Sequence, residues 1–349
     1  MHHTSKTDKI SKISKFGKIK NLLLNKFFII LVLIFIIVLV LANWPSEPSE
    51  YDYGVTFSSK YVRELGLDPV ETFDAIVDEM SIKKIRLVAY WDEIEREKDI
   101  YDFSDLDWQI SRAEEKDVEV ILALGRRVPR WPECHFPEWI YGKSWQNQQD
   151  ELMDYIRTLV NRYKNSSAIK YWQVENEPFL TAYVPEICGS ELDKTFLGAE
   201  IFLVRLLDPS RKIITTDSGN LGLWLGAYKR GDIFGSTFYI YLTNDKVGEI
   251  KSRVNHNFYK FKKIVAQTLY GKKPVYLIEV SLEPWLVEPI IVTPIDVQLR
   301  FMNIDRIDEI LEKSAKTNFD EIYLWGIEWW YYLKVNGHPE IWDYLKNKL

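Results

Sequence analysis

From residue 53 onward the chain alternates between short apolar runs and segments with the spacing of amphipathic helices. Several of the apolar runs are hydrophobic at almost every position, which is typical of parallel strands that are buried on both faces. We expect eight strands, at residues 53–57, 84–90, 118–124, 170–174, 212–216, 233–239, 274–278 and 321–325. Helices are expected between them at 69–80, 105–116, 147–163, 192–207 and 297–317, and Asp68 should cap the first of these, with Pro69 at its first position.

Eight successive β-then-α units in about 300 residues predict an α/β fold, a single (β/α)8 TIM barrel over residues 53–349. Length alone would also allow two domains. A doubly wound open sheet is the alternative, but a glycine-rich phosphate loop usually follows its first strand, and Ser58-Ser59-Lys60 contains no glycine. In a barrel, the residues that carry function gather at the carboxyl ends of the strands.

Two glutamates lie at such expected strand ends. Glu177 belongs to an Asn-Glu-Pro motif after the fourth expected strand, and Glu279 directly follows the seventh. A retaining glycosidase needs two carboxyl groups, one protonated to assist the leaving oxygen and one ionised to attack the sugar. Three further residues should converge on the same end of the barrel: Arg86 within the second strand, Tyr239 at the end of the sixth and Trp325 at the end of the eighth.

These features resemble clan A of the glycoside hydrolases, the retaining (β/α)8 enzymes that include cellulases, mannanases and β-xylosidases. The Asn-Glu-Pro motif matches the acid/base motif of this clan, and Glu279 matches the position of its nucleophile. The resemblance covers residues 53–349. Residues 130–135 and 283–285 depart from the usual pattern, so the resemblance does not identify one family or one sugar.

The resemblance implies a double displacement on a β-linked oligo- or polysaccharide, with Glu177 as general acid and then general base and Glu279 as nucleophile. It also implies supporting contacts: Asn176 with the sugar 2-hydroxyl, Arg86 and Tyr239 with Glu279, and Trp325 as the floor under the reacting sugar. Two other functions use the same residues. One is a barrel that binds glycan without turnover, and the other is a transglycosidase that hands the sugar to an acceptor other than water.

Three loop residues complete the expected sugar contacts, namely Trp131, His135 and Trp285. Some assignments have competitors nearby. Glu283 competes with Glu279 for the role of nucleophile, although Glu279 directly follows the apolar run. Tyr241 competes with Tyr239 for the contact with Glu279. Trp329 and Trp330 lie close to Trp325, and at least one of the three should pack under a helix.

Charge is unevenly distributed along the chain. The net charge is −6, and the first 26 residues carry seven lysines against Asp8, so the remainder carries −12. An acidic body excludes nucleic acid as a ligand, because phosphate binding needs a basic face. Aromatic residues make up 14% of the chain, which suits both a cleft that stacks on sugars and a large, well-filled core.

The N-terminal segment predicts export of the body. Residues 1–26 read as a basic cytoplasmic tail, 27–43 as a transmembrane anchor, 44–52 as a short linker, and 53–349 as the barrel. The lysines before the apolar run favour a cytoplasmic N-terminus. A cleaved signal peptide is the alternative, because the small Ala42 closes the apolar run.

The sequence contains two cysteines, Cys134 and Cys188. Outside the cytoplasm they would either form one disulfide or remain two free thiols. Neither belongs to a cluster with the spacing of metal ligands, and no nucleotide-binding loop is present, so we expect no metal and no cofactor.

Overall fold

The computed structural model describes residues 26–30, 32–33, 35–37, 40, 47–180, 188, 193–244 and 246–349. The chain forms two compact units, Met1–Pro45 and Ser46–Leu349. Most of the expected basic tail and several residues of the expected membrane anchor lie outside the described residues. Those of the anchor that are described, between residues 27 and 40, are helical and exposed. No helix within the described residues combines the length and the apolar character that crossing a membrane requires.

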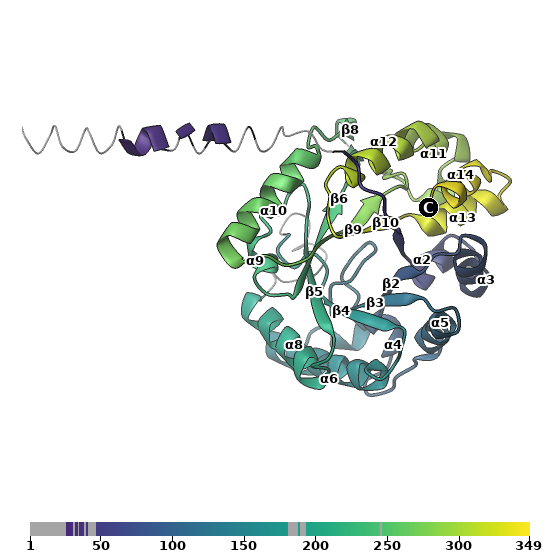
Figure 1. Ribbon diagram of the computed structural model, residues 1–349. Coiled ribbons are helices and arrows are strands. Elements are labelled where there is room, and N and C mark those ends of the chain that lie inside the picture. Colours follow the sequence, from purple (N-terminus) through teal and green to yellow (C-terminus); the bar gives the residue numbers. More distant parts are fainter. Residues whose placement is uncertain are drawn as a thin grey trace, which may run out of the picture. The chain divides into compact units, whose positions relative to one another are not determined.

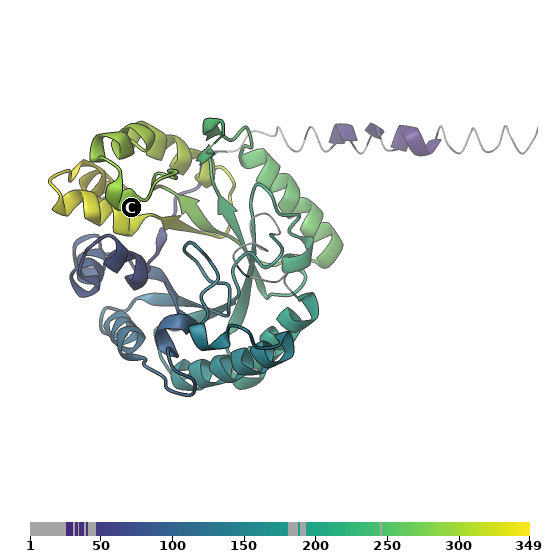
Figure 2. The same ribbon diagram turned by 180° about the vertical axis from the view of Figure 1, so that it is seen from behind.

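The second unit is a closed barrel of eight parallel strands with helices forming an outer ring (Figures 1 and 2). This confirms the (β/α)8 prediction. The strands, in their order around the barrel, are β1 (Gly54–Thr56), β10 (Glu321–Trp325), β9 (Val275–Ser281), β6 (Ile233–Phe238), β5 (Lys212–Asp217), β4 (Ile169–Val174), β3 (Glu119–Leu124) and β2 (Lys84–Val88).

All eight expected strands are present, with ends shifted by up to three residues. The largest shift is in β9, which was expected to stop at residue 278 and continues to Ser281. Glu279 therefore lies inside a strand, not after it. Strand β6 ends at Phe238, one residue before Tyr239, whereas Trp325 is the last residue of β10 as expected.

Most helices also follow the prediction. These are α3 (Pro69–Asp74), α5 (Ser104–Glu115), α6 (Trp145–Tyr163) and α8 (Lys194–Leu207). Asp68 caps α3 as expected, since its side chain accepts hydrogen bonds from the backbone N–H groups of Val70 and Glu71. The helical path of α3 continues as a short π-helical segment, Ala75–Glu79.

One expected helix is two helices. The segment 297–317 contains α11 (Ile295–Phe301) and α12 (Ile304–Ala315), because Asn303 is extended and its side chain accepts a hydrogen bond from the backbone N–H of Arg306. The remaining elements were not predicted: α2 (Ser59–Glu64), α4 (Trp91–Ile94), α9 (Leu225–Tyr228), the hairpin of β7 (Tyr241–Asn244) and β8 (Gly248–Lys251), α10 (His256–Tyr270), α13 (Ile327–Val335) and α14 (Glu340–Lys348).

Among the described residues the hydrophobic core has two main parts and a small third cluster of Val88, Tyr90 and Val128. The larger part lies between the strands and the ring of helices. A smaller cluster of buried side chains comes from β3, β5, β6, β9 and β10 alone, as expected of a packed barrel interior. Its members are Ile121, Ile214, Ile233, Tyr276, Ile278 and Tyr323. Because the interior is filled with side chains, only the end of the barrel is left for a ligand.

Candidate active site

Glu279 points into the barrel because β9 is irregular. Tyr276 and Ile278 belong to the interior cluster, so simple alternation would turn Glu279 outward. The pairing of β9 shifts register against both neighbours at this point: against β6 after Leu277, and against β10 between Leu277 and Val280. Such bulges re-aim side chains next to functional sites. Here the bulge places Glu279 beside Arg86 of β2.

Both oxygens of Glu279 are held by donors. Arg86 donates from Nη1 to Oε1 at 2.6 Å, and the Tyr239 hydroxyl donates to Oε2 at 3.1 Å. Burial and the charge of Glu279 raise the pKa of Tyr239 well above its ordinary value, so this phenol keeps its proton and remains a donor. Arg86 and Tyr239 thus fix both oxygens of the Glu279 carboxyl group.

Arg86 is fully buried and joins three strands of the barrel. Besides Glu279 it binds Gln173 of β4, with Nε donating to Oε1 at 2.8 Å, and Asn176, with Nη2 donating to Oδ1 at 2.8 Å. The amide oxygen of Asn176 is therefore occupied by the protein. Its Nδ2 forms no hydrogen bond within the part of the chain that the structure describes, so it can donate to a ligand.

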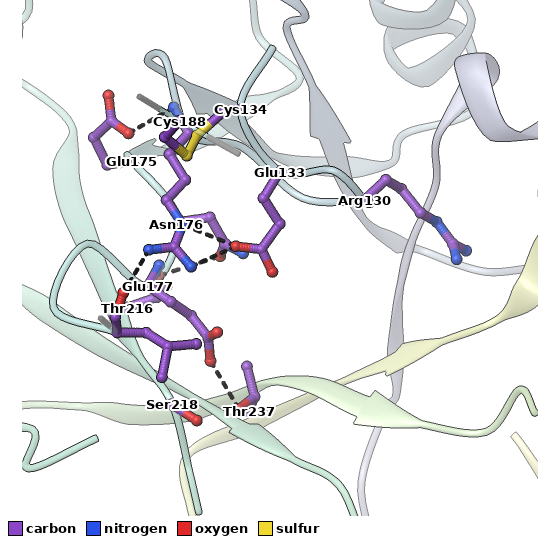
Figure 3. A network of polar contacts seen from close by, with 12 residues as sticks. Arg130, Glu133, Cys134, Glu175, Asn176, Glu177, Cys188, Thr216, Ser218 and Thr237 are labelled. Atoms are coloured by element: carbon purple, nitrogen blue, oxygen red, sulfur yellow. Dashed lines mark hydrogen bonds and ion pairs between the residues drawn. A yellow bond between two sulfur atoms is a disulfide. The ribbon is translucent and has the colours of Figure 1, made fainter. Parts of the chain in front are cut away.

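Glu177 follows β4 in a strained backbone conformation. Its φ angle is 44° and that of Glu175 is 59°, a left-handed region that non-glycine residues rarely adopt. Thr216 of β5 holds the turn, because its hydroxyl accepts a hydrogen bond from the backbone N–H of Glu177 at 2.8 Å. The turn directs the Glu177 side chain toward Thr237, whose hydroxyl donates to Oε1 at 3.0 Å (Figure 3).

The two candidate carboxyl groups have opposite electrostatic environments. No cation forms an ion pair with Glu177 among the described residues, and 6% of the residue is exposed. Burial first, then the charges of Glu133 and Glu279, raise the pKa of Glu177 well above its ordinary value. Glu177 is thus suited to hold a proton near neutral pH, whereas Glu279 forms an ion pair with Arg86.

A third carboxylate, Glu133, lies near these two and was not predicted from the sequence. It sits on the loop after β3, and Arg127 binds its Oε2 with Nε at 2.8 Å and Nη2 at 2.6 Å. The loop has no periodic pattern, but the sequence does carry two signals for the pair. Arg127 is the third residue after β3, as Glu177 is the third after β4, and Glu133 belongs to the unusual stretch 130–135.

Glu175 points away from Glu177, toward the β3 loop, as Figure 3 shows. Its two oxygens accept hydrogen bonds from the backbone N–H groups of Arg126 and Arg127, each at 2.7 Å. Gly125 permits this approach, because a Cβ there would lie 2.4 Å from Oε1 of Glu175, and its φ of 129° is open to glycine alone. Glu175 therefore fixes the loop that carries Glu133.

Behind Glu175 lies a second buried acid, Glu200 of α8. Its oxygens have no donor group within the described residues, so a hydrogen bond between Glu200 and Glu175 requires a proton on one of the two carboxyl groups. Burial and the charge of Glu175 raise the pKa of Glu200 well above its ordinary value. Two ionised carboxylates would repel each other in this buried place, so the contact between Glu175 and Glu200 is stable only while Glu200 carries a proton.

We expect Glu200→Gln to make the protein less sensitive to alkaline pH. A carboxyl group whose pKa is raised by folding contributes stability below its unfolded value, about 4.5, and this stability is lost as the pH rises through the folded value. The amide cannot ionise, so the variant should gain about 1–3 kcal/mol relative to the wild type at pH 8 and much less at pH 5. Thermal unfolding at both pH values measures this. Glu64→Gln, an exposed glutamate of α2, is the control, and an equal shift in melting temperature at both pH values would contradict the expectation.

Trp325 is held by a network around Arg130. The Arg130 guanidinium lies between the rings of Tyr61 and Trp325, 3.8 Å and 4.1 Å from their centroids. Glu283 accepts a hydrogen bond from Trp325 Nε1 at 2.6 Å and pairs with Arg130 at 2.5 Å. Arg130 also pairs with the buried Glu328. Glu283, the alternative nucleophile, is thus committed to positioning Trp325, which is 5% exposed.

The other competitors are engaged elsewhere. The Tyr241 hydroxyl donates to Glu309 at 2.5 Å, away from Glu279. Trp329 and Trp330 are fully buried and donate to Gln298 and to the Leu282 carbonyl. Both are residues of α13 that belong to the larger part of the hydrophobic core.

The three loop candidates differ in accessibility. Trp131 is 64% exposed and Trp285 is 41% exposed, and Trp285 packs edge-on against Tyr239, with ring centroids 5.5 Å apart. Both rings are available to a sugar. His135 is 1% exposed, with Nε2 3.0 Å from the Arg130 carbonyl and Nδ1 3.2 Å from Lys60 Nζ. Its two ring nitrogens are therefore occupied by protein groups.

Cys134 and Cys188 form a disulfide, with Cα atoms 5.5 Å apart (Figure 3). It links the loop after β3 to the segment after β4, and Arg126 also donates to the Cys188 carbonyl. The bridge therefore clamps the two loops that carry Glu133 and Glu177. Among the residues that the structure describes, no three His, Cys, Asp or Glu side chains are grouped to hold a metal ion.

Comparison with known proteins finds similar glycoside hydrolases. The family model of glycosyl hydrolase family 10 matches residues 71–200. The chain is 26% identical over 121 residues to a probable mannan endo-1,4-beta-mannosidase A from Aspergillus niger. That match covers 33% of this chain, and it spans 30% of the length of the curated relative.

Solved structures share the fold. Xylanase 10B from Thermotoga petrophila aligns with a TM-score of 0.50 at 18% identity, covering 78% of this chain and 81% of the xylanase. The protein GH5_18 from Bifidobacterium longum aligns with a TM-score of 0.53 at 12% identity, covering 79% of this chain and 70% of that one. With the family model, these matches confirm the resemblance to clan A of the glycoside hydrolases.

Proposed function

We propose that this protein is a retaining glycosidase that hydrolyses the O-glycosyl bonds of β-linked glycans. One observation carries the proposal: two carboxyl groups at the same end of the barrel lie in opposite environments. Glu279 is paired with a buried arginine, and Glu177 is buried without a cation partner among the described residues. A double displacement requires this division into an ionised nucleophile and a protonated acid.

In the first step, a Glu279 oxygen attacks the anomeric carbon while Glu177 gives its proton to the departing glycosidic oxygen. Asn176 binds the sugar 2-hydroxyl through Nδ2, because its oxygen is already held by Arg86. Trp325 lies under the reacting sugar, and Trp131 and Trp285 offer exposed rings to neighbouring sugars. The products of this step are a glycosyl ester on Glu279 and a free leaving group.

In the second step, Glu177 acts as a base. Ester formation removes the negative charge of Glu279, which is one of the causes that raise the pKa of Glu177. The pKa of Glu177 therefore falls in the intermediate, and its carboxylate can take a proton from the attacking water. The ester breaks, the sugar leaves with retained configuration, and both carboxyl groups return to their starting states.

The test is sugar release from a panel of β-linked substrates by residues 51–349. The panel contains xylan, mannan, a soluble cellulose derivative and p-nitrophenyl β-glycosides of one and two sugars. Proton NMR of the first product determines the anomer that is formed. We expect release from at least one substrate, with the β-anomer appearing first. Inversion would contradict the double displacement.

The same panel separates two other functions. Binding of oligosaccharides measured by calorimetry, with no release from any substrate, would favour a glycan-binding barrel. Longer oligosaccharides appearing in place of free sugar would favour transfer to a sugar acceptor over transfer to water. The comparisons name xylanases and a mannosidase, so xylan and mannan are the first substrates to examine.

We propose further that residues 27–43 anchor the protein in a membrane, with the barrel outside the cytoplasm. The apolar run with preceding lysines supports this arrangement, and so does the disulfide, because such bridges persist in oxidising compartments. Fractionation of cells that express the full chain tests the anchor. Recovery of the barrel in the medium, with a new N-terminus near residue 43, would indicate a cleaved signal peptide instead.

A further inference from the structure

We infer that Glu133 is a substrate-binding residue of this site, whose free carboxylate oxygen accepts hydrogen bonds from the hydroxyl groups of a neutral sugar. The inference rests on the proposed glycosidase function and adds to it a third functional carboxylate. Neither the glycosidase chemistry described above nor the motifs of the sequence assign a role to this residue.

The backbone holds Glu133 in a fixed and unusual conformation. Its φ angle is 67°, in the region that non-glycine residues rarely adopt. Its N–H donates to the Arg130 carbonyl at 2.7 Å, and its carbonyl accepts from the N–H of Val128 at 2.8 Å. The neighbouring Cys134 is tied to Cys188. Strained residues that the surroundings hold so firmly are typical of functional sites.

The side chain of Glu133 is bound on one oxygen only. Both hydrogen bonds from Arg127 go to Oε2, and Oε1 has no partner within the described residues. The Arg127 side chain is 7% exposed, whereas that of Glu133 is 25% exposed. Arg127 is itself fixed by a further hydrogen bond, because its Nη1 donates to the Leu180 carbonyl at 3.0 Å. Arg127 therefore fixes the Glu133 carboxyl group through Oε2 and leaves Oε1 without a protein partner among the described residues.

The carboxyl group of Glu133 lies on the same side of the site as that of Glu177. In Figure 3 the carboxyl groups of Glu133 and Glu177 extend into the same space from the loops after β3 and β4. The electrostatics agree with this placement. After burial, the charge of Glu133 is the largest cause that raises the pKa of Glu177, and Glu133 also interacts with the charge of Glu279. The loop after β3 thus brings the charge of Glu133 to the end of the barrel where Glu177 and Glu279 lie.

The chemistry of this group selects its partner. Burial, the largest cause, raises the pKa of Glu133 above its ordinary value, although the charge of Arg127 opposes the rise. Arg127 binds Oε2, so the free oxygen Oε1 presents its lone pairs to a ligand and fits a partner that is a hydrogen-bond donor. Sugar hydroxyls are donors, whereas the carboxylate of a uronic acid would be repelled. A simple loop-fixing ion pair would explain the Arg127 contact, but it would not require an exposed and unpartnered oxygen beside two catalytic carboxyl groups.

Three variants test the inference. Glu133→Gln removes the charge and keeps the shape, and Glu133→Asp keeps the charge and withdraws the oxygen by one methylene. Glu138→Gln, on an exposed part of the same loop, is the control. For each we would measure kcat/KM against pH on the p-nitrophenyl β-glycoside that the wild type cleaves fastest, and the binding of xylotriose and mannotriose by calorimetry. Thermal melting verifies folding.

We expect both Glu133 variants to lower kcat/KM about 10- to 100-fold, as for the loss of a charge-assisted hydrogen bond. Glu133→Gln should also move the alkaline limb of the pH profile to lower pH, because the pKa of Glu177 falls when the neighbouring charge is removed. Glu133→Asp should move this limb less. The shift of the limb reports the charge of Glu133 alone, whereas weaker binding of xylotriose and mannotriose by a variant that melts at the wild-type temperature reports its contact with sugar.

The outcomes for Glu133 and for the glycosidase are distinguishable. If Glu133→Gln keeps kcat/KM within twofold of the wild type with an unchanged alkaline limb, the inference is wrong while the glycosidase stands. If the wild type releases no sugar but binds a trisaccharide at least tenfold more tightly than Glu133→Gln does, the inference holds and the glycosidase is wrong. If the wild type neither turns over nor binds any of these sugars, both are wrong.

Discussion

Glu279→Gln is expected to lower kcat by a factor on the order of 10⁴ or more, because an amide cannot form the glycosyl ester. The variant should fold normally, since glutamine has the same shape and its oxygen can still accept from Arg86. Binding of substrate should change far less than kcat. Steady-state kinetics on the best substrate of the panel, with calorimetry for binding, measures both quantities.

The matched control is Glu288→Gln, which changes an exposed glutamate on the loop after β9. It should leave kcat within twofold of the wild type. Mass spectrometry with a 2-fluoro glycoside adds a direct readout, because such a compound traps the ester on the nucleophile. A label on Glu283, or full activity of Glu279→Gln, would exclude Glu279 as the nucleophile.

Glu177→Ala is expected to have an effect that depends on the leaving group. For glycans, whose leaving oxygen needs a proton, kcat/KM should fall about 10²- to 10⁴-fold. For a dinitrophenyl glycoside, whose leaving group departs without a proton, the fall in kcat/KM should be much smaller. Added azide should raise kcat on this substrate, because a small anion can enter the space left by the carboxyl group and attack the ester without a base.

The pH profile provides a second readout of Glu177. In the wild type, kcat/KM should fall as the pH rises through the raised pKa of Glu177, since the proton needed for the leaving group is lost. This alkaline limb should be absent in Glu177→Ala. Equal losses on the glycan and on the dinitrophenyl glycoside, with the alkaline limb retained, would mean that another residue is the acid.

The barrel was predictable because its signal is local and repeated. Each buried strand is a run of apolar residues, and each covering helix has its own periodicity, so errors at single ends leave the pattern intact. The helix expected at 297–317 shows the limit. Its two halves have compatible periodicity. The break at Asn303 depends on one side chain, which accepts a hydrogen bond from the backbone N–H of Arg306.

The position of Glu279 was predictable, but the reason for its orientation was not. The sequence places it after an apolar run, which suggests a strand end, whereas β9 continues to Ser281. What directs it inward is a bulge that depends on pairing with β6 and β10, and pairing between distant segments leaves no local signature.

Glu133 was missed for a different reason. Its importance arises from Arg127 on the same loop and from Glu177 on the next, and the loop between β3 and α6 has no repeating pattern that a sequence could reveal. The role of Glu283 also depends on contacts between distant segments. The sequence offers it as a rival nucleophile, but in the structure it binds Trp325 and Arg130.

The buried guanidinium of Arg86 has a consequence for protein engineering. It joins side chains of β2, β4 and β9, separated by up to 193 residues in the chain, and its partners Gln173 and Glu279 lie within strands. The arginine contact of the nucleophile is therefore set by the strands, and the other contacts around this pair come from Tyr239 and Asn176, which lie within two residues of a strand end. Grafting new loops onto the barrel, or moving its termini by circular permutation at the opposite rim, should leave this geometry unchanged while the range of accepted glycans is redesigned.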